Sequence, residues 1–93
     1  MREEDLKIII TLHEWQNLSK AAAAMYISQP TLSKQLHRIE AELGAALVNR
    51  TNRGISFTKE GEYLASQAHS ILALIEETKK NVRDMADQAD ENV

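Results

Sequence analysis

The segment from Asn17 to Gly44 constrains the fold of this chain more than any other part of it. It reads NLSKAAAAMYISQPTLSKQLHRIEAELG and carries signals that start and stop helices. Asn17 and Ser28 can each accept a hydrogen bond from a free N–H in the first turn of a helix. Pro30 fits the first turn of a helix, and Gly44 suits the left-handed residue that commonly ends one. The segment therefore predicts two short helices joined by a tight turn.

The first of these helices, over residues 18–25, contains four consecutive alanines at positions 21–24. Alanine side chains have little bulk, so the backbone of a second helix can pack closely against them. Two helices that cross at such a contact are what a helix-turn-helix DNA reader requires. We therefore expect residues 18–25 and 29–43 to form this unit.

The second helix can be oriented by the spacing of its apolar residues. Leu32, Leu36, Ile39 and Leu43 form one stripe, which we expect to face the core. The opposite side and its flanks carry hydrogen-bond donors, positive charge and an imidazole but no carboxylate: Pro30, Thr31, Ser33, Lys34, His37 and Arg38. This composition favours a surface that meets DNA, and the alternative is an ordinary solvated helix face.

Individual residues of this surface have different expected roles. Gln29 could pair in bidentate fashion with adenine, and Lys34 could donate to O6 and N7 of guanine. Thr31, Ser33 and Arg38 suit contacts to phosphate, as do the free N–H groups at the start of the helix.

The net charge of −3 does not exclude DNA binding, because the charges are unevenly distributed. Between residues 18 and 59, six Lys or Arg residues stand against two Glu residues. Phosphate attraction acts mainly within a Debye length of roughly 8–10 Å, so the local sign outweighs the total. The acidic excess lies outside the segment expected to read DNA.

Further elements are expected on both sides of this unit. Apolar residues at helical spacing predict a helix over residues 3–14, and Thr58 can cap a long helix that ends near residue 89. Alternating side chains around a turn predict a pair of strands, or wing, over residues 48–50 and 55–57. The predicted fold class is all-α, mainly α with a small two-stranded wing: a winged helix-turn-helix followed by a long dimerisation helix.

The predicted domain organisation has three parts. Residues 1–58 form a winged helix-turn-helix DNA-binding domain, residues 59–89 a linker and dimerisation helix, and residues 90–93 a disordered tail.

The long helix carries an apolar stripe that steps alternately by four and three residues, a period of 3.5. Its members are Leu64, Ala68, Ile71, Ile75, Thr78, Val82, Met85 and Ala89. A small domain cannot bury a helix of this length alone, so we expect the stripe to pair with a second copy. The alternative is a helix that packs only within its own chain.

Many positions match a known family. They are Ala21–Ala22, the SQP of residues 28–30, Ser33, Ile39–Glu40, Leu43–Gly44, Leu47, Arg50, Arg53, and Thr58 with Gly61. Over residues 6–72 the chain resembles the LysR-type transcriptional regulators. The resemblance implies a winged helix-turn-helix followed by a linker helix through which two subunits dimerise.

The resemblance also implies roles for single residues. Gln29, Pro30, Thr31, Ser33 and Lys34 would lie in the major groove. Arg53 in the wing would reach phosphate or the minor groove, and Arg50 would contact phosphate or brace the wing.

The chain departs from the family pattern at several positions. Val48 and Phe57 stand where Phe and Leu are usual, and Asn17 replaces the common Ser while preserving the cap. Lys34 replaces Arg, which exchanges a planar fork for a point charge. Family members continue into a ligand-sensing domain, and we expect this effector-binding domain to be absent from the chain.

Other classes of function are disfavoured. Ser33, His37 and Glu40 lie along one helix, but a small exposed helix offers neither an oxyanion hole nor a cleft, so we expect no enzyme. His13, His37 and His69 fall on different helices, so we expect no metal site and no cofactor. The absence of Cys, of a signal peptide and of a membrane-spanning run predicts a cytoplasmic protein.

The sequence thus predicts a homodimer that binds duplex DNA at a (pseudo)palindromic site. The competing hypothesis is a dimeric helical protein-interaction module without specific DNA binding. Trp15, Tyr26, Phe57 and Tyr63 are expected to pack in or at the edge of the core. The predicted DNA-binding residues are Asn17, Ser28, Gln29, Pro30, Thr31, Ser33, Lys34, His37, Arg38, Arg50 and Arg53.

Overall fold

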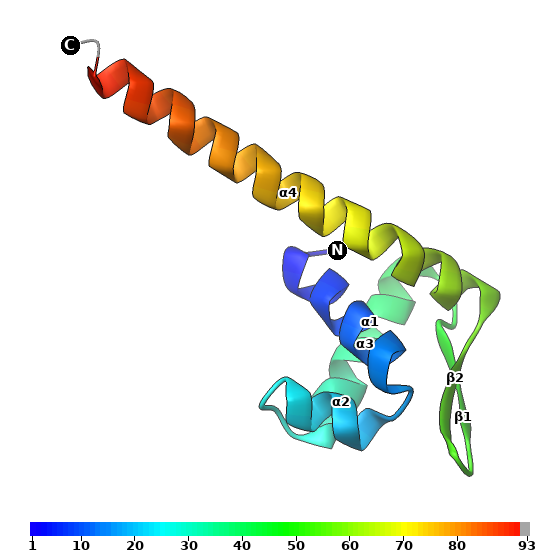
Figure 1. Cartoon of the computed structure of the whole chain (residues 1–93). Helices are drawn as coiled ribbons and strands as arrows, with labels where there is room; N and C mark the ends of the chain where they lie inside the picture. The colour runs from blue at the N-terminus through cyan, green and yellow to red at the C-terminus, as the bar shows by residue number, and fades with distance from the viewer. Residues whose placement is uncertain (92–93) are drawn as a thin grey trace.

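The structure is a computed structural model that describes residues 1–91, without the side chains of residues 89–91. It contains helices α1 (Glu3–Trp15), α2 (Leu18–Ala24), α3 (Gln29–Leu43) and α4 (Lys59–Glu91), and strands β1 (Val48–Thr51) and β2 (Gly54–Phe57). The first three helices and the strand pair form a head, and α4 runs past α1 and leaves the head as a long rod (Figure 1). The predicted winged helix-turn-helix architecture is confirmed.

Helix starts and stops follow the predicted signals. The Asn17 side chain accepts a hydrogen bond from the Lys20 N–H at 2.8 Å, and Ser28 Oγ accepts from the Thr31 N–H at 3.2 Å. Gly44 ends α3 with φ of 68°, in the left-handed region. Each observed boundary lies within one or two residues of its prediction, and α4 continues to Glu91. Residues 92–93 of the predicted tail lie outside the described residues.

The core forms where α1, α3 and the proximal part of α4 meet. Its fully buried apolar side chains are Ile9, Leu12, Leu32, Leu36, Ile39 and Leu47. Ala21 and Ala22 are buried as well, which confirms the close approach expected of α2. The prediction that Leu43 faces the core is wrong, because it lies in the last turn of α3 and is 43% exposed.

The wing is an antiparallel pair in which Val48 lies opposite Phe57 and Thr51 opposite Gly54. It joins α4 without a linker, and Thr58 at this junction takes part in three hydrogen bonds. The Thr58 N–H donates to the Leu47 carbonyl at 3.0 Å, and Thr58 Oγ1 donates to the Ala46 carbonyl at 2.7 Å. The same oxygen accepts from the Gly61 N–H at 3.0 Å, which confirms Thr58 as a helix cap.

The predicted positions of the aromatic residues are mostly wrong. Tyr26 is 96% exposed, because it occupies the turn between α2 and α3 with φ of 59° and projects outward. Tyr63 and Trp15 are also exposed. Only Phe57 packs partly against the core, with its ring edge-on to His13 at a centroid distance of 4.9 Å.

Helix α4 has a packed part and a free part. Leu64, Ala65 and Ala68 are buried in the chain's own core, and Ile75 is partly buried against it. The prediction that Leu64 and Ala68 belong to a dimer seam is not supported, because their side chains pack into the chain's own core, with 9% and 0% of their surface exposed. Beyond Ile75 the described side chains of α4 are exposed.

Candidate nucleic-acid interface

The N-terminal half of α3 presents a polar, exposed row of side chains. Gln29, Pro30, Thr31, Lys34 and His37 are exposed. Ser33 lies half-buried among them. The row faces outward because Leu32, Leu36 and Ile39 hold the opposite side of the helix in the core.

Both glutamates of α3 are engaged away from this row. Glu40 accepts a hydrogen bond from the Leu47 N–H at 2.7 Å, which ties the end of α3 to the start of the wing. Glu42 pairs with the N-terminal amino group and with Arg38. The outward row of α3 is therefore free of carboxylates.

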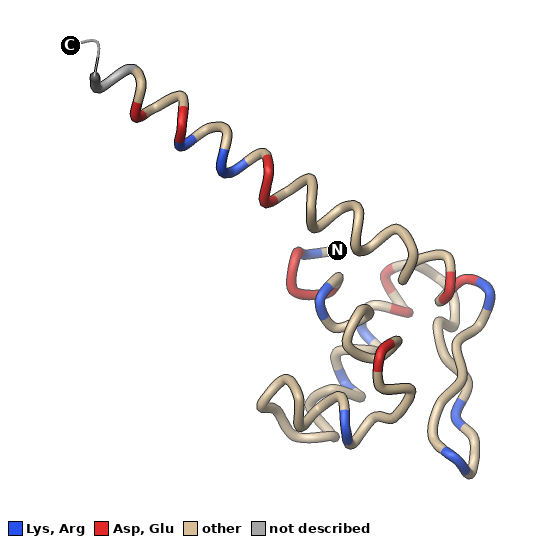
Figure 2. The backbone as a smooth tube through the Cα atoms, viewed as in Figure 1, with Lys and Arg blue, Asp and Glu red and all other residues tan. Residues whose placement is uncertain are grey.

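Basic positions gather on this side of the molecule. Lys and Arg positions lie on α2, α3 and the wing, whereas α4 carries both signs of charge near its two ends and none between residues 63 and 75 (Figure 2). Arg50 bridges the wing to α3, since its Nη2 donates to Ser33 Oγ at 3.0 Å. Arg53 lies exposed in the turn at the wing tip. The wing therefore adds two positive charges beside the row on α3.

A polar cavity of about 250 Å³ lies between the starts of α2 and α3 and the wing. Its lining residues are Asn17, Leu18, Ser19, Gln29, Arg50, Thr51, Gly54 and Ile55. The wing approaches closely here, because the Ile55 N–H donates to the Gln16 carbonyl at 3.4 Å. This cavity joins three predicted DNA-binding residues, Asn17, Gln29 and Arg50.

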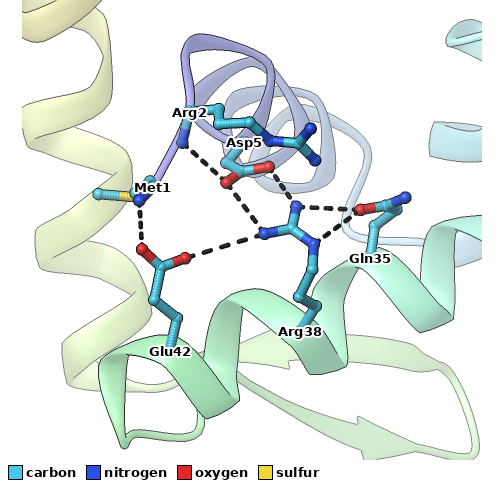
Figure 3. Close-up of polar contacts among 6 residues, drawn as sticks. All are labelled: Met1, Arg2, Asp5, Gln35, Arg38 and Glu42. Carbon is cyan, nitrogen blue, oxygen red and sulfur yellow. Dashed lines mark hydrogen bonds and ion pairs between the residues drawn. The ribbon is translucent and has the colours of Figure 1, made fainter.

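Arg38 lies apart from the outward row. Its guanidinium turns toward the N-terminus of α1 and contacts Asp5, Gln35 and Glu42 (Figure 3). Arg38 Nη2 lies 2.5 Å from Asp5 Oδ1, and Gln35 Oε1 accepts from the same nitrogen at 2.9 Å. The expectation that Arg38 is free for phosphate is therefore not met, because Asp5, 33 positions earlier, holds its charged end.

Asp5 is the one charged residue that is fully buried among those the structure describes. Burial raises the pKa of its carboxyl, but hydrogen bonds from Arg38 and from the Arg2 N–H outweigh that effect, so the pKa lies below its usual value. The hydrogen bond to Asp5 raises the pKa of Arg38 in turn. The pair stays charged and joins α1 to the back of α3.

Ser19 is a residue of this surface that the sequence did not single out. Its Oγ donates to Gln29 Oε1 at 2.6 Å, across the crossing of α2 and α3. The ten-residue separation carries no periodic signal, and only the crossing of the helices brings the two side chains together.

Two of the three residues weighed as a catalytic trio, Ser33 and Glu40, are engaged elsewhere. Ser33 accepts from Arg50, and Glu40 accepts from Leu47. His13 contacts Glu62 at 2.7 Å, at the junction of α1 and α4. In the part of the chain that the structure describes, no three His, Asp or Glu side chains converge as metal ligands. None of the helices within residues 1–91 combines the length and apolar character needed to cross a bilayer.

Residues 4–62 match the family model described as bacterial regulatory helix-turn-helix protein, lysR family. The chain is 37% identical over 93 residues to the DNA-binding transcriptional dual regulator OxyR of Escherichia coli K12. It is 34% identical over 86 residues to the uncharacterized HTH-type transcriptional regulator YraN of Bacillus subtilis, and that match covers 92% of this chain. The match to OxyR spans all of this chain but only 29% of OxyR, and the match to YraN spans 30% of YraN.

Solved structures show the same arrangement. The DNA-binding domain of CbnR in complex with DNA superposes with a TM-score of 0.88 at 34% identity, over 92% of this chain and 99% of that one. The BenM DNA-binding domain in complex with benA site 1 DNA gives a TM-score of 0.84 at 30% identity, over 92% and 97% of the two chains.

Proposed function

The chain belongs to the lysR family of bacterial regulatory helix-turn-helix proteins, and from that premise we propose that it binds duplex DNA sequence-specifically as part of a transcriptional regulator. The observation that carries the proposal is the carboxylate-free polar row on α3 beside a basic wing. Domains of CbnR and BenM with this fold are solved in complex with DNA, which supports the same partner here.

In the proposed complex, α3 enters the major groove with its N-terminal half. The groove is about 12 Å wide and admits a helix. Gln29, Thr31, Ser33 and Lys34 then face base edges and phosphates, with Pro30 and His37 beside them. Asn17 and Ser28 keep their capping roles and place helix N-termini near the backbone.

The wing flanks the same groove. Arg53 at its tip reaches the backbone or the minor groove, and Arg50 fixes the wing to α3 through Ser33. Arg38 has a different role from the one expected of it: it braces α3 from behind through Asp5.

We also propose that two copies pair through the distal part of α4. Its free part exposes apolar side chains that a monomer leaves in water, with Leu74 62% and Met85 68% exposed. Ile71 and Val82 are exposed beside them, and Ile75 and Thr78 complete the stripe. Leu74 was not in the predicted seam and joins it here. Such a pair would place two α3 helices on a (pseudo)palindromic site with half-sites one helical turn or a multiple apart.

In a bacterial cell, such a protein would work in the cytoplasm on the nucleoid. The matched relatives are named as regulators, and the proposed activity is binding without catalysis.

A salt titration of DNA binding tests the proposal. Fluorescence anisotropy with a labelled duplex, selected by the protein from a random pool, should show log affinity falling linearly with log salt. Each phosphate neutralised adds about 0.9 to the slope, so several contacts give a steep line. A shuffled duplex of equal length is the control for sequence specificity. Affinity that is absent, or flat in salt, would favour the protein-interaction module instead.

A further inference from the structure

Hydrogen bonds made by side chains of α3 within the free protein determine which donor and acceptor atoms remain available to DNA. Ser19 Oγ donates to Gln29 Oε1 at 2.6 Å, so the amide oxygen is directed toward α2. The amide nitrogen lies on the other side of the same planar group and carries two donors. Gln29 therefore presents its NH₂ group outward, and the two-point contact with adenine, which needs the oxygen as well, is disfavoured.

The hydroxyl groups of the same row are also hydrogen-bonded to other side chains of the protein. Ser33 Oγ accepts from Arg50 Nη2 at 3.0 Å, and Thr31 Oγ1 accepts from Ser28 Oγ at 2.8 Å. Each hydroxyl keeps its own proton to donate and a second lone pair with which to accept, so neither hydroxyl by itself favours one base.

The charged groups complete this pattern. Lys34 has three donors and no acceptor. The carboxylates that could accept from a base, Glu40 and Glu42, are bound to Leu47 and to Arg38 on other sides of the helix. Gln29 and Lys34 therefore offer donors, and neither carboxylate of α3 faces the outward row.

In the major groove, guanine shows two acceptors and thymine shows one, whereas cytosine shows a donor and adenine a donor beside an acceptor. We propose that Gln29 and Lys34 donate to guanine or thymine acceptors where α3 contacts bases, and that Ser19 is the positioning residue that commits Gln29 to this choice. The proposal rests on the proposed DNA binding and specifies its chemistry.

Base replacement in the selected duplex tests the first half. Where a contacted base is guanine, 7-deazaguanine removes the N7 acceptor and should weaken binding by about fivefold or more. Inosine is the matched control, because it keeps N7 and O6 and lacks only the minor-groove amino group; it should bind like guanine. For a contacted thymine, 5-methyl-2-pyrimidinone, which lacks the O4 acceptor, should cause a similar loss. Full tolerance of 7-deazaguanine would overturn the proposal, as would a loss of binding when purine, which lacks the N6 amino donor, replaces an adenine under α3.

Substitution of Ser19 tests the second half. Ser19→Ala frees the Gln29 amide to rotate, so adenine should become acceptable at the position that Gln29 reads. Binding to non-specific DNA should stay within about twofold, because no charge changes. Ser70→Ala, at an exposed serine of α4, is the control and should leave the base preference unchanged.

A double substitution shows whether Ser19 acts through Gln29. In a Gln29→Ala background, Ser19→Ala should have no further effect on base preference. If Ser19→Ala leaves the preference unchanged while Gln29→Ala alters it, the positioning role is refuted although DNA binding stands. If the unmodified protein shows no sequence-selective binding at all, the proposed function itself fails, and the two failures are distinguishable.

Discussion

Asp5 and Arg38 form a charged pair whose two members differ in exposure. Asp5 is fully buried, whereas the Arg38 side chain keeps 40% of its surface exposed. Removing the arginine would leave a buried carboxylate with only the Arg2 N–H as partner. At the scale of single residues, we therefore expect a substitution of Arg38 on α3 to lower the stability of the fold and not to remove a contact with DNA.

Arg38→Met should destabilise the fold, by less than the roughly 3–5 kcal/mol typical of a broken buried pair, because solvent screens the exposed arginine. Urea unfolding followed by circular dichroism measures this change. Arg83→Met, at an exposed arginine of α4, should leave stability within about 0.5 kcal/mol and is the control. Unchanged stability with weakened DNA binding would instead restore the phosphate role expected from the sequence.

Gly61→Ala should destabilise the fold, at the junction of the wing and α4, more than Gly44→Ala does. A Cβ there would lie 2.0 Å from the Leu47 carbonyl oxygen and 2.8 Å from a Phe57 ring carbon. Gly44→Ala is the comparison, because nothing lies within 4 Å and only its φ of 68° opposes the change, at a cost of about 1 kcal/mol. Thermal unfolding of both variants should rank Gly61→Ala as the less stable, and the reverse order would contradict the packing described here.

At the scale of elements, most of the helices and strands could be predicted because their signals are local. Caps at Asn17, Ser28 and Thr58 and the stop at Gly44 depend on neighbouring residues alone. The direction of Arg38 could not be predicted in this way, since its partner lies on another helix. The sequence also could not show which part of α4 packs in the core and which part is exposed, because core packing and pairing between chains use similar helical spacing.

The free part of α4 should control association. Met85→Glu places a charge in the exposed apolar stripe and should shift the protein toward monomer in sedimentation velocity at micromolar concentration. Ala73→Glu adds the same charge at an exposed position on the opposite side of the helix from the stripe, and should leave the sedimentation coefficient unchanged. Equal behaviour of the two variants would contradict pairing through this stripe.

At the scale of the whole molecule, two carboxylates of α1 with lowered pKa values connect this helix to α4 and to α3. The pKa of Glu3 is lowered chiefly by its hydrogen bond to Lys79, which joins α1 to α4. The lowered pKa of Asp5 acts between α1 and α3. Both carboxylates therefore bind protons less readily in the folded chain than in the unfolded one.

Stability should accordingly fall on acidification. A carboxyl whose folded pKa is lowered contributes fully above its unfolded value, near 4, and loses that contribution as the pH drops through the folded value. Urea unfolding between about pH 6 and pH 2 should show this decline, with most of it below about pH 4. Asp5→Asn should flatten the dependence, and an unchanged slope in that variant would assign the decline to other groups.

The absence of a linker between the wing and α4 has a mechanical consequence. The Thr58 hydrogen bonds and the close approach of Gly61 to Leu47 hold the start of α4 against the head, so the two can move together as a lever. The molecule is 62 Å long, so a rotation of one degree at the far end of α4 would displace the reading helix by about 1 Å if the lever moves as one body. A small change in the angle at which two α4 helices pair would thus produce a larger change in the distance between the two α3 helices, and so in the spacing of the half-sites that they fit.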